Sequence, residues 1–181
     1  SKNLNWNKVN IFLLDERLVD IDNINSNYKN IKKILYKNNL DKKLKPLTLK
    51  NLKKNNIYNI LKLLNSVRTI SLVGMGADGH FASIFSKSKN FKMLIDASNK
   101  PKYIKISKIG KPKVDRLTMN LSMILISKKI YLLLNNRKKF LIFLHALKSK
   151  NYEKYPIFAL LQRAKKKIKV YYKSKEFKFK I

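Results

Sequence analysis

Short apolar runs alternate with amphipathic stretches along this chain, and that order limits its possible folds more than any other property. The runs "TISLVGMG", "KIYLLL" and "IKVYY" are typical of strands, whereas "RKKFLIFLHALKS" and "PIFALLQRA" carry apolar residues at helical spacing. The proline of the last stretch stands where a helix accepts it, in the first turn. Strands that alternate with helices predict an α/β layer structure with a mainly parallel sheet.

The remaining segments follow the same pattern. "VNIFLLDER", Val9–Arg17, is predicted to be a buried strand with polar residues at its carboxyl end. A helix is predicted after it, with Ser26 or Asn27 as its N-cap, and a second helix over Asn51–Asn65. Farther along, "KYIKIS" alternates as a strand does, and "LTMNLSMILIS" is predicted to be helical.

Length and composition set the class of protein. With 181 residues, of which 45% are apolar, we expect one α/β domain over residues 1–181. The absence of cysteine excludes disulfides and thiolate metal sites, and it is compatible with a reducing cytosol. The longest uncharged apolar-rich run, Leu117–Ser127, is shorter than the roughly 18–20 residues that cross a membrane, so we expect no membrane span.

The net charge of the chain is +32, from 42 basic and 10 acidic residues. Such a charge favours non-specific binding to polyanions at low salt. Only five of the basic residues are arginine, which is the residue suited to forked contacts with bases and phosphates. Lysine is spread over the whole chain and shares A- and T-rich codons with asparagine and isoleucine. A base-biased genome therefore explains this composition without a nucleic-acid partner.

The stretch "SLVGMGADGHFASIFS" holds most of the chain's glycine. Gly74, Gly76 and Gly79 match the G-x-G-x-x-G pattern of dinucleotide-binding loops, and Asp96 follows at a suitable distance. The helix predicted to begin at "HFASIF" is short for a crossover helix, which argues against a nicotinamide cofactor. A tight strand-to-helix turn explains one glycine well and three poorly.

His80 suggests a second use for this loop. At the first turn of the predicted helix, the positive end of the helix dipole would disfavour the protonated imidazole. A neutral imidazole at a strand terminus suits general base catalysis, and neighbouring glycine amides suit the stabilisation of an oxyanion. A purely structural histidine remains an alternative, and it is the expected role of His145, which lies inside an amphipathic stretch.

The loop "GMGADGHFASIFS" closely resembles the G-M-G-x-D-G-H-x-A-S-x-F-P signature of 6-phosphogluconolactonases. Three further blocks resemble the same family in the same order: "WNKVNIFLLDERLVDIDNINSN", "DRLTMNLSMILISKKIYLLLNNRKK" and "YPIFALLQRAKKKIKVYY". Together the blocks extend from Trp6 to Tyr172. The resemblance implies a Rossmann-like, mainly parallel sheet with helices on both faces, truncated at the amino terminus.

The resemblance also implies an activity, namely hydrolysis of 6-phosphoglucono-δ-lactone to 6-phosphogluconate in the cytoplasmic, oxidative pentose phosphate pathway. No metal or organic cofactor is implied, because a lactone is an activated ester. His80 would take a proton from the attacking water and return it to the ring oxygen. Asp78 would orient the loop or the imidazole, although a simple turn or capping role is an equally good interpretation. Gly74, Gly76 and Gly79 would line the substrate.

Cations and hydroxyl-binding groups are implied on the same basis. Arg17, Arg116 and Lys139 match charged positions of the family and would clamp the phosphate. Asp15 matches the site aspartate of the family and would hydrogen-bond sugar hydroxyls. The pair Ser26 and Asn27 matches the S-N pair of the family, but helix capping is at least as good an explanation.

The chain departs from the family pattern in several places. The serine- and glycine-rich S-G-G-S/T-x-P loop that cradles the phosphate has no counterpart here, and Leu18, Ser86 and Asn136 replace a tryptophan, a proline and a glycine. The sequence is then a fragment of a longer product, a chain completed by another chain, or an eroded protein. Two other functions therefore stay open: a non-catalytic binder of sugar phosphates or polyanions, and a glucosamine-6-phosphate deaminase. The sequence does not predict the oligomeric state.

Overall fold

The computed structural model describes residues 5–37, 39–52, 54–66, 68–173 and 175–179. Its α-helices are α1 (Asn27–Tyr36), α2 (Lys54–Ser66), α3 (Phe91–Ile95), α4 (Leu121–Ile124), α5 (Arg137–Ser149) and α6 (Ile157–Ala164). Its strands are β1 (Ile11–Phe12), β2 (Asp15–Arg17), β3 (Leu44–Lys45), β4 (Ile70–Gly74), β5 (Tyr103–Ile109), β6 (Val114–Met119), β7 (Lys129–Leu134), β8 (Ile168–Tyr172) and β9 (Lys175–Phe177). Short 3-10 turns lie at Trp6–Lys8, Asp41–Lys43, Lys50–Leu52 and Lys165–Lys167.

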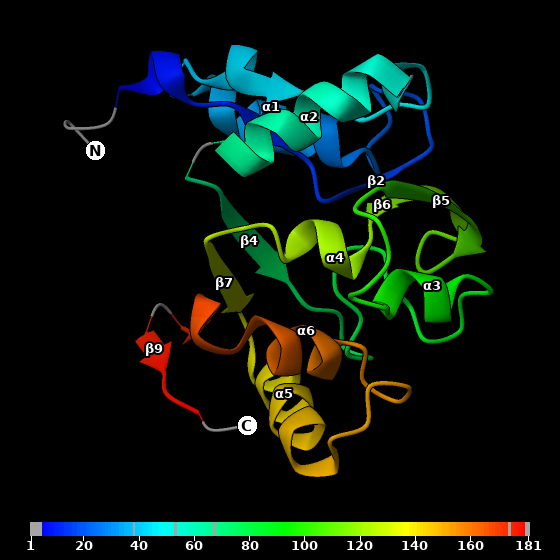
Figure 1. The fold of residues 1–181 in the computed structure, drawn as a ribbon, viewed down its shortest axis with the longest axis vertical. Coiled ribbons are helices and arrows are strands. Elements are labelled where there is room, and N and C mark those ends of the chain that lie inside the picture. Colours follow the sequence, from blue (N-terminus) through cyan, green and yellow to red (C-terminus); the bar gives the residue numbers. More distant parts are fainter. Residues whose placement is uncertain (1–4, 38, 53, 67, 174, 180–181) are drawn as a thin grey trace.

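The largest sheet has the strand order β4-β7-β8-β9, in which β4, β7 and β8 are parallel and β9 is antiparallel to β8. Figure 1 shows α5 and α6 together beyond one end of this sheet, α4 beside it, and α1 and α2 at the opposite end of the molecule. The pairing of Gly74 with Leu133 brings the carboxyl ends of β4 and β7 to the same edge. The predicted α/β architecture with parallel strands is confirmed.

The segment predicted as a single strand over Val9–Arg17 is instead divided between two sheets. Its first part, β1, pairs with β3, whereas β2 joins an antiparallel sheet of order β2-β6-β5. The reason is a polar contact that periodicity does not reveal. The buried carboxylate of Glu16 accepts the backbone N–H groups of Asn27 (2.7 Å) and Tyr28 (2.6 Å), which ties β2 to the first turn of α1. Ser26 is the N-cap of that helix and accepts the N–H of Lys29.

Two predicted helices are also wrong. The first residues of "LTMNLSMILIS" belong to β6, and only Leu121–Ile124 is helical, because the side chain of Asn120 caps that short helix by accepting the N–H of Met123. No helix begins at His80. Ala82 has a φ of +47°, a left-handed value that a helix excludes, and the segment folds back through bridges between Met75 and Phe81 and between Phe81 and Ile84.

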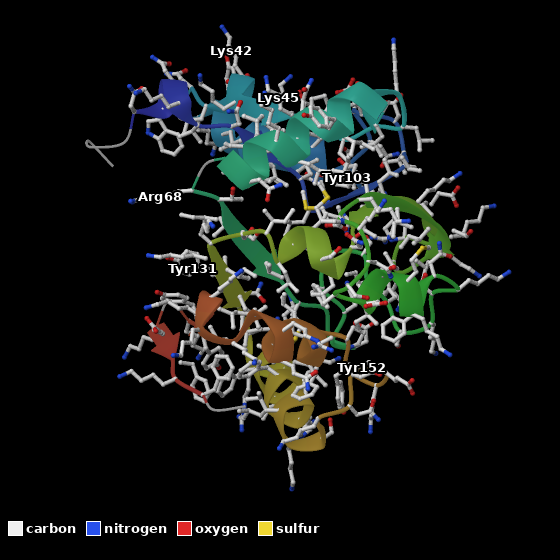
Figure 2. All side chains as sticks on the ribbon, viewed as in Figure 1. Lys42, Lys45, Arg68, Tyr103, Tyr131 and Tyr152 are labelled. Carbon is white, nitrogen blue, oxygen red and sulfur yellow. The ribbon has the colours of Figure 1, made fainter. Side chains whose placement is uncertain are left out.

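The other predicted elements are confirmed, with small shifts of their ends. The helix predicted over Asn51–Asn65 is α2, Lys54–Ser66, and of that prediction Lys53 lies outside the described residues. Among the described residues, no helix is long and apolar enough to cross a membrane. Figure 2 shows nitrogen-tipped side chains projecting from all parts of the outline, with Lys42, Lys45 and Arg68 among them, so the basic charge is not confined to one element.

Strand β4 is an end strand of its sheet, and its two faces differ. Ser71 and Val73 are buried against the core, whereas Ile70 and Leu72 are 57% and 64% exposed. Burial on one face only is the pattern of a strand at the margin of a sheet, not that of a central parallel strand. The strand nevertheless fixes the start of the glycine loop, because its inward residue Val73 belongs to the hydrophobic core.

Candidate active site

The loop after β4 holds a fixed shape through its backbone. The N–H of Gly76 donates to the carbonyl of His80 (2.8 Å), and the N–H of Gly79 donates to the carbonyl of Gly76 (3.1 Å). The carbonyl of Gly79 in turn accepts the N–H of Ile157 (2.8 Å) at the start of α6. Because the amides of Gly76 and Gly79 already have partners, neither is available to stabilise an oxyanion as the sequence suggested.

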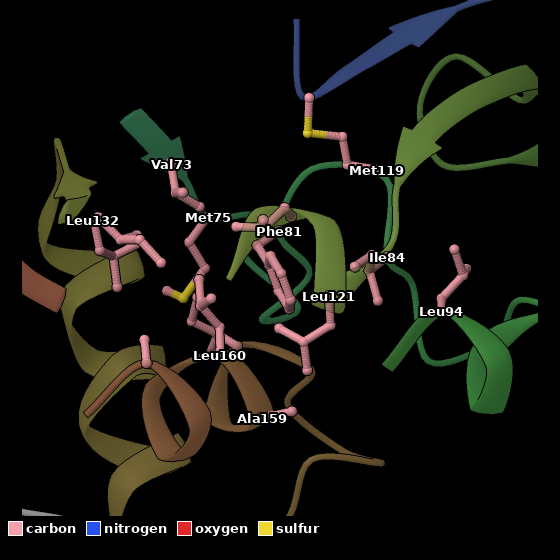
Figure 3. Packing of buried hydrophobic residues seen from close by; sticks show 14 of the residues in the cluster. Val73, Met75, Phe81, Ile84, Leu94, Met119, Leu121, Leu132, Ala159 and Leu160 are labelled. Carbon is pink, nitrogen blue, oxygen red and sulfur yellow. The ribbon is translucent and has the colours of Figure 1, made fainter. Parts of the chain in front are cut away.

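Apolar residues of the same loop anchor it in the core. Met75, Phe81, Ile84 and Phe85 are all buried. Figure 3 shows Phe81 between Met75 and Leu121, with residues of α6 close by. The polar residues of the loop therefore stand on a packed base, and the position of His80 is set by the burial of its neighbour Phe81.

His80 and Asp78 form a pair at the surface of this base. The Nδ1 atom of His80 lies 2.5 Å from Oδ1 of Asp78, and the two side chains are 27% and 64% exposed. Partial burial opposes ionisation of Asp78, but the hydrogen bond and charge of His80 outweigh it and lower the pKa of this carboxyl below its ordinary value. An Nδ1–H that donates to Asp78 leaves Nε2 as the basic nitrogen of a neutral imidazole.

Gly76 provides the space that this pair occupies. A Cβ atom at position 76 would lie 2.1 Å from Cε1 and 2.2 Å from Nδ1 of His80, and 2.7 Å from Oδ1 of Asp78. Gly79 has a φ of +80°, and its Cβ would lie 3.1 Å from the Cα of Tyr155. By contrast, nothing lies within 4 Å of a Cβ built on Gly74. The predicted site glycines therefore differ: two are required by sterics and one is not.

The G-x-G-x-x-G pattern does not make a dinucleotide site here. In that site the pyrophosphate meets the amino end of a helix that follows the glycines directly. In this chain the next α-helix, α3, begins only at Phe91. The glycines instead accommodate the His80–Asp78 pair and the close approach of Tyr155.

Asp15 on β2 connects the loop to the antiparallel sheet. Its Oδ2 atom accepts the hydroxyl proton of Ser83 (2.6 Å), and the N–H of Ser83 donates to the hydroxyl of Thr118 (3.2 Å). Burial raises the pKa of Asp15, and the Ser83 hydrogen bond and the charges of Arg17 and Arg116 only partly offset that effect. Ser83, which the sequence reasoning did not assign to the site, is therefore the link between the two predicted site segments.

The raised pKa of Asp15 gives a testable pH dependence. Its pKa exceeds 3.8 in the folded protein, so the folded state binds this proton more tightly than the unfolded chain does. This contribution to stability is fully present below pH 3.8 and is lost as the pH rises through the folded pKa. Asp15→Asn removes that loss and can still accept the Ser83 hydroxyl. We expect the variant to have a higher free energy of unfolding than the wild type at pH 7.

Urea denaturation at a series of pH values measures this difference. The difference in free energy of unfolding between Asp15→Asn and the wild type should become smaller as the pH falls toward 3.8. Asp20→Asn, at an exposed position of the same loop region, makes the same change of charge and serves as the control. If Asp15→Asn were less stable than the wild type at pH 7 and reached the wild-type stability at low pH, ionised Asp15 would stabilise the fold, which would contradict this prediction.

Arg17 and Arg116 are brought together by the pairing of β2 with β6, where they stand opposite each other. Arg17 donates from Nη1 to the carbonyl of Asn25 and the side chain of Asn27, and its buried Nε has no hydrogen-bond partner among the described residues. Arg116 is only 3% exposed and donates to the carbonyls of Ile109 (2.9 Å) and Pro112 (3.0 Å). Burial and the charge of Arg17 lower the pKa of Arg116.

Lys139 lies on a different element from the other predicted cations. It is in the first turn of α5, where its N–H donates to the side chain of the N-cap Asn136 (3.0 Å). Helix α5 follows β7, and β7 ends beside β4, so Lys139 and His80 both follow strands that reach the same edge of the sheet. Asn136 has an extended φ of −147° and acts as a cap.

A cleft of about 370 Å³ lies beside Arg17. Its lining includes Leu18, Ser26 and Thr48 but not His80. The predicted charged residues of the site and His80 are therefore arranged in three groups: Asp15, Arg17 and Arg116 on the antiparallel sheet, His80 with Asp78 on the loop, and Lys139 on α5. Ser83 connects the first two groups by its hydrogen bond to Asp15.

Comparison with known proteins shows the family to which the chain belongs. Residues 1–170 match the model of the family described as glucosamine-6-phosphate isomerases/6-phosphogluconolactonase. A 6-phosphogluconolactonase of Neisseria meningitidis is 28% identical over 177 residues, covering 94% of this chain and 76% of that protein. One of Helicobacter pylori is 27% identical over 173 residues, covering 94% and 74%.

Solved structures of this family have a similar fold. A crystal structure of a 6-phosphogluconolactonase from Shewanella baltica superposes with a TM-score of 0.77 at 26% identity, covering 94% of this chain and 74% of that one. A monomeric glucosamine-6-phosphate deaminase shares the fold, with a TM-score of 0.67 at 18% identity. The chain therefore belongs to the glucosamine-6-phosphate isomerase/6-phosphogluconolactonase family.

Proposed function

We propose that the protein hydrolyses 6-phosphoglucono-δ-lactone to 6-phosphogluconate, with His80 as the general base. The observation that carries this proposal is the His80–Asp78 pair, whose Nδ1 and Oδ1 atoms are 2.5 Å apart. The pair occupies space that a Cβ atom at Gly76 would fill. Family membership and relatives named 6-phosphogluconolactonase support the same reaction.

The reaction follows from the chemistry of the imidazole. Nε2 of His80 takes a proton from a water molecule as the water oxygen attacks the lactone carbonyl carbon. The imidazolium, stabilised by the Asp78 carboxylate, then gives this proton to the ring oxygen as the carbon–oxygen bond breaks. The products are a carboxylic acid and a hydroxyl group, and the base returns to its first state. General base catalysis of this kind contributes about 10²–10⁴-fold.

The substrate's other groups need separate partners. Arg17 carries a buried Nε without a hydrogen-bond partner among the described residues, which suits it to an anionic ligand. Lys139 at the same edge of the sheet as His80 provides a second cation for the phosphate. We assign Asp15, beside Arg17 on β2, to hydrogen bonds with sugar hydroxyls, and burial raises the pKa of its carboxyl.

The test is turnover by the purified protein. The lactone is generated in the cuvette by oxidation of glucose 6-phosphate, and 6-phosphogluconate is measured through its own dehydrogenase, with spontaneous ring opening subtracted. We expect a rate proportional to the concentration of the protein. A rate no faster than spontaneous opening would overturn the proposal. Ammonia release from glucosamine 6-phosphate would indicate a deaminase, and polyanion binding without turnover would indicate a non-catalytic binder.

A further inference from the structure

Two further flat groups, the ring of Phe85 and the guanidinium of Arg116, lie behind the imidazole of the proposed base. The imidazole of His80 lies on the ring of Phe85, with centroids 4.0 Å apart and planes inclined by 30°. The guanidinium carbon of Arg116 lies 5.4 Å from the centroid of the same phenyl ring. Phe85 and Arg116 are 6% and 3% exposed. The partly exposed imidazole is therefore backed by a buried aromatic ring and a buried cation.

The hydrogen bonds of Arg116 go to backbone carbonyls. Nε donates to the carbonyl of Ile109, the last residue of β5, and Nη2 donates to the carbonyl of Pro112, in the connection between β5 and β6. Gly110 of that connection has a φ of +78°, and a Cβ there would lie 2.8 Å from both Nη2 of Arg116 and Cζ of Phe85. The hairpin thus closes over the guanidinium of Arg116, a residue that is only 3% exposed and whose Nε and Nη2 already donate to these carbonyls.

We propose that Arg116 and Phe85 are positioning residues of the lactonase, which hold the His80 imidazole, and that Arg116 is not a ligand of the substrate phosphate. This inference rests on the proposed function. Asp78 fixes Nδ1, the absence of a Cβ at Gly76 leaves room for the ring edge, and Phe85 fixes the ring plane. Arg116 in turn contacts the ring of Phe85. Together these contacts direct Nε2 toward the substrate.

Steady-state kinetics separate the two possible roles of Arg116. In Arg116→Met and Phe85→Leu, we expect kcat to fall by about 10- to 100-fold, because a base displaced by about 1 Å loses reactivity on that order. The KM for the lactone should stay within about two-fold of the wild-type value, because no substrate contact is lost. Arg163→Met removes an exposed arginine on α6 and should leave both constants unchanged. A large rise of KM in Arg116→Met with unchanged kcat would overturn the proposal.

A spectroscopic measurement tests the same contacts without activity. The chain has only two histidines, so histidine-selective NMR labelling gives one set of ring signals for His80 and one for the exposed His145. Stacking on Phe85 should shift the His80 ring protons upfield in the wild type. We expect Phe85→Leu to abolish this shift and Arg116→Met to reduce it, while the His145 signals stay in place. Unchanged His80 signals in Arg116→Met would also overturn the proposal.

Gly110→Ala provides a second route if loss of the buried guanidinium prevents folding. Its added methyl group would press on Phe85 and Arg116, which hold the nearest atoms to it, and we expect the same fall in kcat and the same loss of upfield shift. Wild-type kinetics in that case would contradict the role of the stack. If the wild type itself lacks turnover, the proposed function fails, whereas the NMR signals still decide whether Arg116 positions His80.

Discussion

His80→Asn is expected to lower kcat for the lactone by about 10²–10⁴-fold, which is the usual contribution of a general base. Asparagine keeps a polar side chain of similar size but takes up no proton at neutral pH. Because His80 is partly exposed and its neighbours Phe81, Ile84 and Phe85 provide the packing, we expect the variant to fold normally. The coupled assay for 6-phosphogluconate measures the effect, and thermal unfolding checks the fold.

His145→Asn is the matched control, because it makes the same substitution at the chain's other histidine, which is exposed on α5. Its kcat should equal that of the wild type. If His80→Asn also turned over the lactone at the wild-type rate, His80 would have no part in proton transfer.

Gly76→Ala is expected to lower kcat by about 10²-fold or more with a nearly unchanged fold. Its Cβ would lie 2.1 Å from Cε1 of His80, a distance that real Cβ atoms do not reach, so the ring must move. Asp78, at 2.7 Å from the same Cβ, must move as well. A displacement of about 1 Å is enough to cost this much in rate. Steady-state turnover measures the loss, and the NMR signals of His80 report the displacement.

Gly74→Ala is the control for that experiment. It makes the same change two residues earlier in the loop, where no atom lies within 4 Å of the added Cβ. Its turnover should remain within about two-fold of the wild type, because nothing contacts the new methyl group. Equal activity of Gly74→Ala and Gly76→Ala would mean that the space beside His80 is not required.

Local periodicity of apolar residues predicts the main parallel strands and the two helices near the carboxyl end of the chain. Strands β4, β7 and β8 and helices α5 and α6 appear where the apolar spacing places them. The break between β1 and β2 does not, because it depends on Glu16, whose buried carboxylate binds the amides at the start of α1. The loop after His80 was wrongly expected to be helical, since strand-like bridges from Phe81 to Met75 and Ile84 determine its path.

The sequence predicts which residues belong to the candidate site better than it predicts what each of them does. All four of the residues that meet in two pairs belong to the sequence motifs. Asp78 pairs with His80, and Arg17 stands opposite Arg116 on the neighbouring strand. Ser83 and Phe85 lie in the same motif as His80, but the motif predicts no role for them, because their contacts with Asp15 and Arg116 join residues far apart in sequence. The signal in the sequence for Ser83 and Phe85 is the hydroxyl and the aromatic ring that follow His80 within the same motif.

The most direct measurement of the central claim is lactone hydrolysis by His80→Ala as imidazole is added, after subtraction of the reaction with imidazole alone. The removed side chain leaves a site beside Phe85 for an exogenous ring. If His80 acts as a base, turnover should be low without imidazole and should rise with the concentration of the unprotonated form. A variant that hydrolyses the lactone at the wild-type rate before any imidazole is added would contradict the account.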